Sequence, residues 1–259
     1  MRVCFIGDIV ALPGRRIVEN ILPDFLRSNN IDICIANAEN SANGLGVSMK
    51  ICESLFKAGV DCITLGNHTF SNHEFLYHAD KDDRVIRPAN INKDWPGNDI
   101  YIVRKGEMKL GVINIEGQVD ISPIGSDPYG KAEELMKEIF SQGVKAVFID
   151  FHAEATSEKN AFGYYCAGRA SVVAGTHTHV QTADNRILKG YTGYITDAGM
   201  TGCYDSVIGM DIECSLRRLK DKLPGRYEAA MGDAFMCGII ADIEPDGRCT
   251  SITRFCEYE

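Results

Sequence analysis

Two histidines separated by one residue are the feature of this sequence that most directly suggests chemistry. His177 and His179 lie in the stretch GTHTHV at residues 175–180, and the chain has only six histidines in 259 residues. Imidazole nitrogens are common metal ligands, so the pair could bind metal. The alternative is an ordinary β-strand, because threonine favours strands and an alternating pattern suits one. The rest of the chain has to distinguish these two interpretations.

Polar side chains that can bind metal follow five short apolar runs, at the point where each run ends. In α/β proteins the carboxyl ends of parallel strands lie along one edge of the sheet, and ligand sites form there. We therefore expect these side chains to converge at one edge, with His68 beside them. The seven candidate metal ligands are Asp8, Glu39, Asn40, Asn67, His152, His177 and His179.

Each candidate also has an ordinary structural interpretation. Asp8 could form a turn or cap a helix, Asn67 could form a turn with Gly66, and His152 could be a hydrogen-bonded core histidine. Five coincidences at the same kind of position nevertheless favour the functional interpretation.

The candidate ligands combine carboxylate oxygens, amide oxygens and imidazole nitrogens, without a thiolate. This mixture suits metals such as manganese, iron, cobalt or zinc. Seven ligands are too many for one tetrahedral zinc ion, but they suit two metals that share a carboxylate. Two-metal sites activate a water molecule and bind both oxygens of an in-line phosphoryl displacement.

The elements that must position these residues are short apolar runs with helical patterns between several of them. Strand–helix–strand alternation predicts a parallel or mixed sheet covered by helices, and RKGEM (104–108) predicts an antiparallel hairpin. Pro13 is expected to start the first helix and Pro23 to kink or split it. The predicted strands are 2–7, 32–37, 61–66, 99–103, 109–115, 145–150, 171–175, 193–196 and 235–243, and the predicted helices are roughly 14–28, 48–58, 128–141, 157–169 and 211–220.

Composition excludes several classes of protein. The net charge of −9 argues against a protein that tracks long nucleic acid, although a metal could still attract a small anionic substrate. The ten cysteines include no CxxC pair, and several lie in apolar runs, which indicates buried reduced thiols. No signal peptide or 18-residue apolar stretch occurs, so we expect a cytoplasmic protein without a membrane partner. No linker or repeat divides the chain, which predicts one domain over residues 1–259; a homo-oligomer is compatible with this composition.

The order of the motifs resembles that of the calcineurin-like metallophosphoesterases. That family usually has DxH, GDxxD and GNHD or GNHE, whereas this chain has a lone Asp8, NAEN (37–40) and GNHT (66–69). These departures are similar to one branch, the YmdB-like phosphodiesterases, and the resemblance extends over essentially the whole chain. The segments that carry it are FIGDIV (5–10), PGRR (13–16), ANAEN (36–40), TLGNHT (64–69), RPAN (87–90), DFHAEATSEK (150–159), GTHTHVQTAD (175–184) and YITDAGMTG (194–202).

The resemblance implies a four-layer α/β/β/α sandwich with two packed mixed sheets and two metal ions, iron first, with manganese or zinc as alternatives. It implies hydrolysis of 2′,3′- or 3′,5′-cyclic nucleotides by attack of a metal-bridging hydroxide on phosphorus, with His68 as general acid. There are two alternative functions. One is a phosphomonoesterase or nucleotidase with the same site, and the other is a metal-binding regulatory protein with little turnover. The implied ligands are Asp8, Glu39, Asn40 and His179 for one metal, and Glu39, Asn67, His152 and His177 for the other.

Two further segments, RPAN (87–90) and GMTGCYDSVIG (199–209), look like loops that line the mouth of this site. The sequence assigns neither of them a role.

Overall fold

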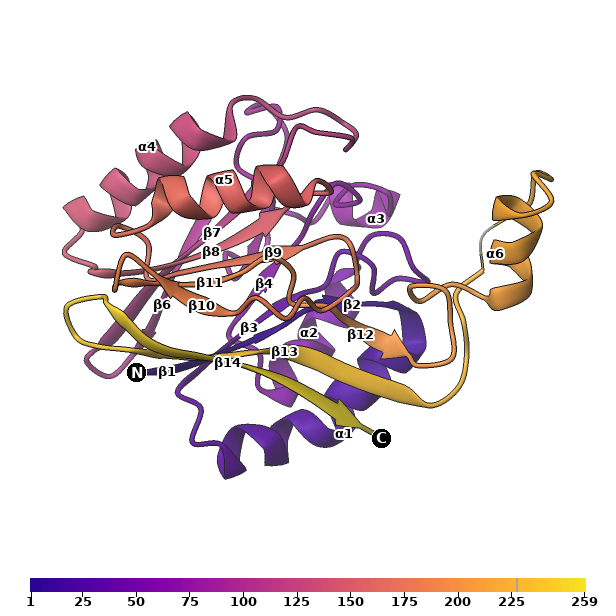
Figure 1. Ribbon diagram of the computed structural model, residues 1–259, viewed down its shortest axis with the longest axis horizontal. Coiled ribbons are helices and arrows are strands. Elements are labelled where there is room, and N and C mark those ends of the chain that lie inside the picture. The colour runs from indigo at the N-terminus through magenta and orange to yellow at the C-terminus, as the bar shows by residue number, and fades with distance from the viewer. Residues whose placement is uncertain (227) are drawn as a thin grey trace.

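Two mixed sheets pack face to face in the computed structural model, which describes residues 1–226 and 228–259 (Figure 1). The strands of the first sheet run in the order β2 (Asp8–Ile9), β12 (Met200–Cys203), β13 (Ala234–Ile243), β1 (Arg2–Ile6), β3 (Ile33–Asn37), β4 (Cys62–Thr64) and β5 (Val85–Ile86), and β14 (Cys249–Tyr258) also pairs with β13. The order in the second sheet is β10 (Arg186–Leu188), β11 (Thr192–Ile195), β9 (Val172–Thr176), β8 (Ala146–His152), β7 (Met108–Glu116) and β6 (Ile100–Lys105).

Helices cover the outer face of each sheet. Two helices, α1 (Ala11–Ser28) and α2 (Met49–Ala58), pack on the first sheet, and α4 (Pro128–Ser141) and α5 (Thr156–Cys166) pack on the second (Figure 1). The result is the predicted four-layer α/β/β/α sandwich. Two shorter helices, α3 (His73–Leu76) and α6 (Ile212–Leu219), lie outside these layers.

Alternation along the strands fills three apolar layers. In β1, Val3 and Phe5 face the space between the sheets, whereas Cys4 and Ile6 face α1 and α2. The rings of Phe5 and Phe148 meet across the sheets with centroids 4.9 Å apart. Because both faces of these strands are covered, they read in the sequence as continuous apolar runs. Truncating a buried phenylalanine of this kind typically costs ~3–5 kcal/mol of stability.

All nine predicted strands and all five predicted helices are present, including the hairpin of β6 and β7. Of the two expectations for Pro23, the split is wrong, because α1 is continuous from Ala11 to Ser28, and the kink stays a prediction. Burial of Leu22 and Phe25, on either side of the proline, holds the helix against the sheet. Pro13 lies in the first turn, where an N–H group has no intrahelical acceptor, rather than at its opening residue.

Several elements were not predicted. Strands β2 and β5 have only two residues each, and α3 has four, so they are too short for a periodic pattern. Strand β14 pairs only with β13, outside the main strand order of the first sheet, and most of its residues are polar or exposed, so it forms no apolar run in the sequence.

The four cysteines that lie in the predicted apolar strands, Cys4, Cys34, Cys62 and Cys237, are buried as expected. The ten cysteines, all among the described residues, form no disulfide. Within the described ranges, no helix has the length and apolar character that crossing a membrane requires.

The same alternation delivers polar side chains to one end of the space between the sheets. In β8, Ala146 and Phe148 belong to the apolar layer between the sheets, so Asp150 and His152 face the same way. Corresponding positions near the carboxyl ends of β3, β4, β7 and β9 are also polar and buried. With Asp150 and His152 of β8, the full set of these buried polar residues is Asn37, Thr64, Asn114, Glu116, Asp150, His152 and Thr176.

Candidate metal centre

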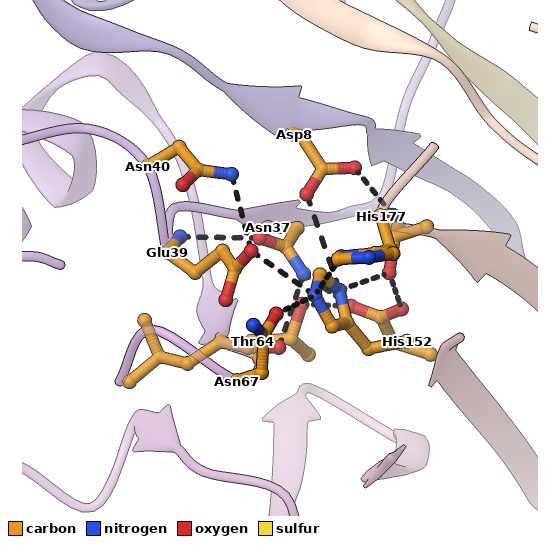
Figure 2. Close-up of polar contacts among 12 residues, drawn as sticks. Asp8, Asn37, Glu39, Asn40, Thr64, Asn67, His152 and His177 are labelled. Atoms are coloured by element: carbon orange, nitrogen blue, oxygen red, sulfur yellow. Dashed lines mark hydrogen bonds and ion pairs between the residues drawn. The ribbon is translucent and has the colours of Figure 1, made fainter. Parts of the chain in front are cut away.

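Three of the predicted ligands converge on a ring nitrogen of a fourth, His152 (Figure 2). His152 Nε2 lies 3.0 Å from Glu39 Oε1, 3.1 Å from Asn67 Oδ1 and 3.1 Å from His177 Nδ1. One ring nitrogen carries at most one proton, so a single hydrogen bond cannot account for three such contacts. Glu39, His152 and His177 offer ligand atoms that all lie within 4.8 Å of one another. The residues therefore fit a cation, which would attract all of these lone pairs at once.

Asp8 and His179 lie on the other side of this cluster. Asp8 is fully buried, and its Oδ2 accepts a hydrogen bond from the backbone N–H of His177 at 3.1 Å. Its Oδ1 has no hydrogen-bond partner among the described residues, and His179 Nε2 lies 3.9 Å away from it. Burial is the main reason that the pKa of Asp8 is raised. A buried carboxylate oxygen without a partner is costly, and a second metal would satisfy it.

Asn40 contacts both groups, but through its amide nitrogen. Its Nδ2 donates to Glu39 Oε1 at 3.1 Å and lies 3.1 Å from His179 Nε2. In this orientation Asn40 orders two other residues of the site rather than offering an oxygen. Ligation by its oxygen, as the resemblance implies, requires the opposite orientation of the amide and remains a prediction.

A buried hydrogen-bond relay determines which nitrogen of His152 faces the site. Thr176 Oγ1 donates to Asp150 Oδ1 at 2.6 Å, so its lone pair is left to accept a hydrogen bond from His152 Nδ1 at 2.9 Å. Burial raises the pKa of Asp150 to about 6, which leaves it mostly ionised, and therefore an acceptor, at neutral pH. Thr64 and Asn37 hold its other oxygen at 2.5 and 2.9 Å. His152 therefore turns Nε2 to the site, and such outer partners are characteristic of metal-binding histidines.

The other two histidines are oriented in the same way by different partners. His177 Nε2 lies 3.2 Å from the carboxylate of Glu154, which leaves Nδ1 facing the cluster. His179 Nδ1 donates to the carbonyl of Ile208 at 2.8 Å, which leaves Nε2 facing Asp8. All three imidazoles thus present an unprotonated nitrogen inward when they are neutral.

The GTHTH segment leaves the extended conformation at its first histidine. Strand β9 ends at Thr176, and His177 and His179 have φ of 94° and 66°, so the strand interpretation is wrong beyond this point. Thr178, between them, donates through both its N–H and its hydroxyl to Asp197, which also accepts from the buried Lys159 at 2.6 Å. Positive φ is unfavourable for histidine and persists only where surrounding contacts enforce it. The spacing of one residue therefore directs both imidazoles to the site and the intervening threonine to its support.

Glu39 and His152 form the main ion pair of the candidate metal centre. Burial alone would raise the pKa of Glu39, but His152 and the backbone N–H of His68 outweigh it and lower the pKa to about 2. Burial likewise opposes protonation of His152, yet Glu39 raises its pKa to about 9. Burial and the neighbouring His152 lower the pKa of His177 to about 3. Before any metal binds, Glu39 and His152 are therefore ionised and His177 is neutral.

The GNH segment holds His68 at the rim. Gly66 is required, because a Cβ there would lie 2.3 Å from His152 Nε2 and 2.4 Å from Glu39 Oε2. The backbone N–H of His68 donates to Glu39 Oε2 at 3.0 Å, and its half-buried ring lies 3.4 Å from the Ser71 hydroxyl through Nδ1. The ring lines an open cleft, where it can reach a bound molecule.

Sequence reasoning missed Glu116, which closes the carboxyl end of β7. It is fully buried, and neither carboxylate oxygen has a partner among the described residues. Burial is the main reason that its pKa is raised to about 7. The apolar run 109–115 ends at this residue, so the strand-end pattern already contained the signal. Asn90 of RPAN holds the backbone of Glu116 through two hydrogen bonds of 2.8 Å, which gives that segment a structural role.

Comparison with known proteins identifies close relatives over the full length. Residues 4–255 match the family described as YmdB-like protein. A 2′,3′-cyclic-nucleotide 2′-phosphodiesterase of Bacillus subtilis is 46% identical over 244 residues, which cover 94% of this chain and 92% of that protein. A hypothetical protein of Thermus thermophilus is 38% identical with a TM-score of 0.93, and both chains are covered completely. A novel phosphatase of Mycoplasma pneumoniae is 31% identical with a TM-score of 0.93, covering 100% of this chain and 94% of that one.

Proposed function

This chain belongs to the YmdB-like protein family, and we propose that it is a two-metal phosphodiesterase that hydrolyses 2′,3′-cyclic nucleotides. The observation that carries the proposal is that Glu39 Oε1 contacts one residue of each ligand group, His152 Nε2 at 3.0 Å and Asn40 Nδ2 at 3.1 Å. The name of the relative from Bacillus subtilis, at 46% identity, supports the choice of substrate. Cyclic 3′,5′-nucleotides are the second class of substrate to test.

The metal ligands divide into two groups that share one residue. Glu39, Asn67, His152 and His177 would hold one metal, in keeping with the contacts of 3.0–3.1 Å around His152 Nε2. Asp8, Glu39, Asn40 and His179 would hold the other, which would satisfy the unpartnered Asp8 Oδ1. Oxygen and imidazole ligands without thiolate suit iron, manganese or zinc, and iron is our first choice.

The metals, when bound, would supply Lewis acidity toward the phosphodiester oxygens and lower the pKa of water. The chain's own residues must then orient the ligands and move a proton. The relay behind His152 and the carboxylate behind His177 hold each ring so that Nε2 of His152 and Nδ1 of His177 face the site. His68, whose ring lines the cleft, would protonate the departing oxygen of the substrate, and Ser71 would orient this ring.

A phosphomonoesterase with the same site is the second candidate, because the relative from Mycoplasma pneumoniae is described as a phosphatase. Cyclic nucleotides and linear nucleoside monophosphates, offered in parallel, distinguish the two activities by their products. A metal-binding regulatory protein with little turnover would hydrolyse neither.

Three variants test the assignment of roles. Asp8→Ala and His179→Ala should lose metal, measured by plasma mass spectrometry, and activity together. His68→Ala should keep its metal but lose ~10²–10⁴-fold in turnover, the usual contribution of general acid catalysis. His73→Ala, which changes an exposed histidine, is the matched control. Full activity in a metal-free preparation would contradict the mechanism, and wild-type activity in His68→Ala would contradict its role as an acid.

A further inference from the structure

A cleft of about 450 Å³ opens between the metal centre and a protruding segment that we call the arm. The arm comprises the described residues 204–226 and 228–233 between β12 and β13, and it carries α6, which stands apart from the sheets in Figure 1. His68, His177 and His179 line the cleft together with residues of the arm. Small-molecule sites typically measure ~300–1,000 Å³, so the cleft is large enough for more of a substrate than its phosphate.

Leu45 and residues of the arm form an apolar wall of the cleft. Leu45, which follows β3, is 50% exposed, and Ile208 and Leu219 of the arm are 50% and 56% exposed. Val207 and Met210 complete this wall, and none of the described arm residues that line the cleft is charged. Aliphatic and thioether side chains in such a concave surface are suited to the flat face of an uncharged ring.

One polar group in this wall has no partner. Ser215 is only 1% exposed, and its hydroxyl forms no hydrogen bond with any described residue. Serines within helices commonly bond the carbonyl four residues earlier, but this hydroxyl does not do so. A buried hydroxyl without a partner destabilises the protein, and a ligand in the cleft would supply the missing bond.

The arm is also tied to the metal centre. The carbonyl of Ile208 accepts the hydrogen bond from His179 Nδ1 at 2.8 Å. Ile208 has φ of 48°, and a Cβ on the next residue, Gly209, would lie 2.7 Å from Val10. This close packing places the wall at a defined position relative to the imidazole of His179.

We propose that the cleft is the nucleoside subsite, in which the base packs against Leu45, Met210 and Leu219 and the nucleoside bonds to the hydroxyl of Ser215. The inference rests on the proposed function, since it requires the phosphodiester to lie at the metal centre. A hydroxyl can both donate and accept, so Ser215 can bond to any of the four bases or to the ribose. The enzyme should therefore discriminate weakly between bases.

Steady-state kinetics of three metal-loaded variants test the subsite. Ser215→Ala and Leu219→Ala should each raise KM for 2′,3′-cyclic AMP and 2′,3′-cyclic CMP by about 3–10-fold, with kcat and metal content unchanged. Neither should affect ethylene phosphate, a cyclic phosphodiester without a nucleoside. Leu216→Ala is the matched control, because Leu216 is also on α6 and 45% exposed but does not line the cleft.

The outcomes separate the two hypotheses. If the wild type hydrolyses ethylene phosphate but no cyclic nucleotide, the proposed substrate is wrong. If it hydrolyses cyclic nucleotides and both variants match it, the subsite is overturned. Equal losses on ethylene phosphate would also overturn it, because they would show a general disturbance of the site.

Discussion

Replacing Glu116 by glutamine should change how the stability of this protein depends on pH. Glu116 is fully buried without a hydrogen-bond partner for either oxygen among the described residues, and burial raises its pKa from the ordinary 4.5 to about 7. The folded protein therefore binds this proton more tightly than the unfolded chain does. Between these two pKa values the folded state holds more protons, so this residue makes stability fall as pH rises.

The size of the effect follows from the same two pKa values. Between pH 5 and pH 8 the wild type should lose ~2.5 kcal/mol of unfolding free energy relative to Glu116→Gln. Burying an amide in place of the carboxyl has its own cost. That cost is independent of pH, so it cancels when the two pH values are compared.

Urea unfolding of metal-free protein at pH 5, 6, 7 and 8 measures this difference. Glu138→Gln is the matched control, because Glu138 is exposed on α4 and its replacement should give the same free energy difference at every pH. A difference between wild type and Glu116→Gln that does not vary with pH would refute the reasoning. It would mean that Glu116 is paired or solvated and titrates normally.

Three further perturbations address the metal centre. Thr176→Val breaks the relay between Asp150 and His152 and should weaken metal binding by ~10–100-fold in a chelator competition. Thr176→Ser keeps the hydroxyl and should restore the affinity. Unchanged affinity in the valine variant would exclude an orienting role for Thr176. Gly66→Ala places a methyl group against His152 and Glu39, so this variant should bind metal at least ~100-fold more weakly. Its circular dichroism spectrum should stay native. Wild-type metal affinity would contradict the close packing at Gly66. Because Glu39 raises the pKa of His152 to about 9, metal must displace this proton at neutral pH, and affinity should increase up to ~10-fold per pH unit from pH 7 to 9. Calorimetry in buffers of different ionisation enthalpy counts the released proton, and a count of zero would show that His152 does not bind through this nitrogen.

The sequence predicts the architecture well because both sheets are buried on both faces. Each internal strand is then an apolar run of about the right length, and all nine predicted strands exist. Elements without such a run, such as β5 and α3, could not be recognised. The predicted split at Pro23 does not occur, because packing of the flanking side chains on the sheet outweighs the loss of one helical hydrogen bond.

The sequence also identifies where the chemistry lies, for a geometric reason. Polar residues at the ends of parallel strands meet at one edge of their own sheet, which groups Asp8 with Glu39 in the first sheet and places His152 at the edge of the second. That these two edges adjoin follows only from the packing of the sheets. Glu116 belongs to the same pattern, at the end of the run 109–115, and was overlooked.

Only the tertiary structure determines how each of these groups is held. The nitrogen that an imidazole turns inward depends on a partner far away in the chain, as with Thr176 for His152, 24 residues later, and Ile208 for His179, 29 residues later. The arm meets the metal centre through such contacts as well, and its unpartnered Ser215 cannot be recognised without them. Strand periodicity is a local property, which a sequence displays directly. Hydrogen-bond partners and the walls of a cleft come from segments that become neighbours only when the chain has folded.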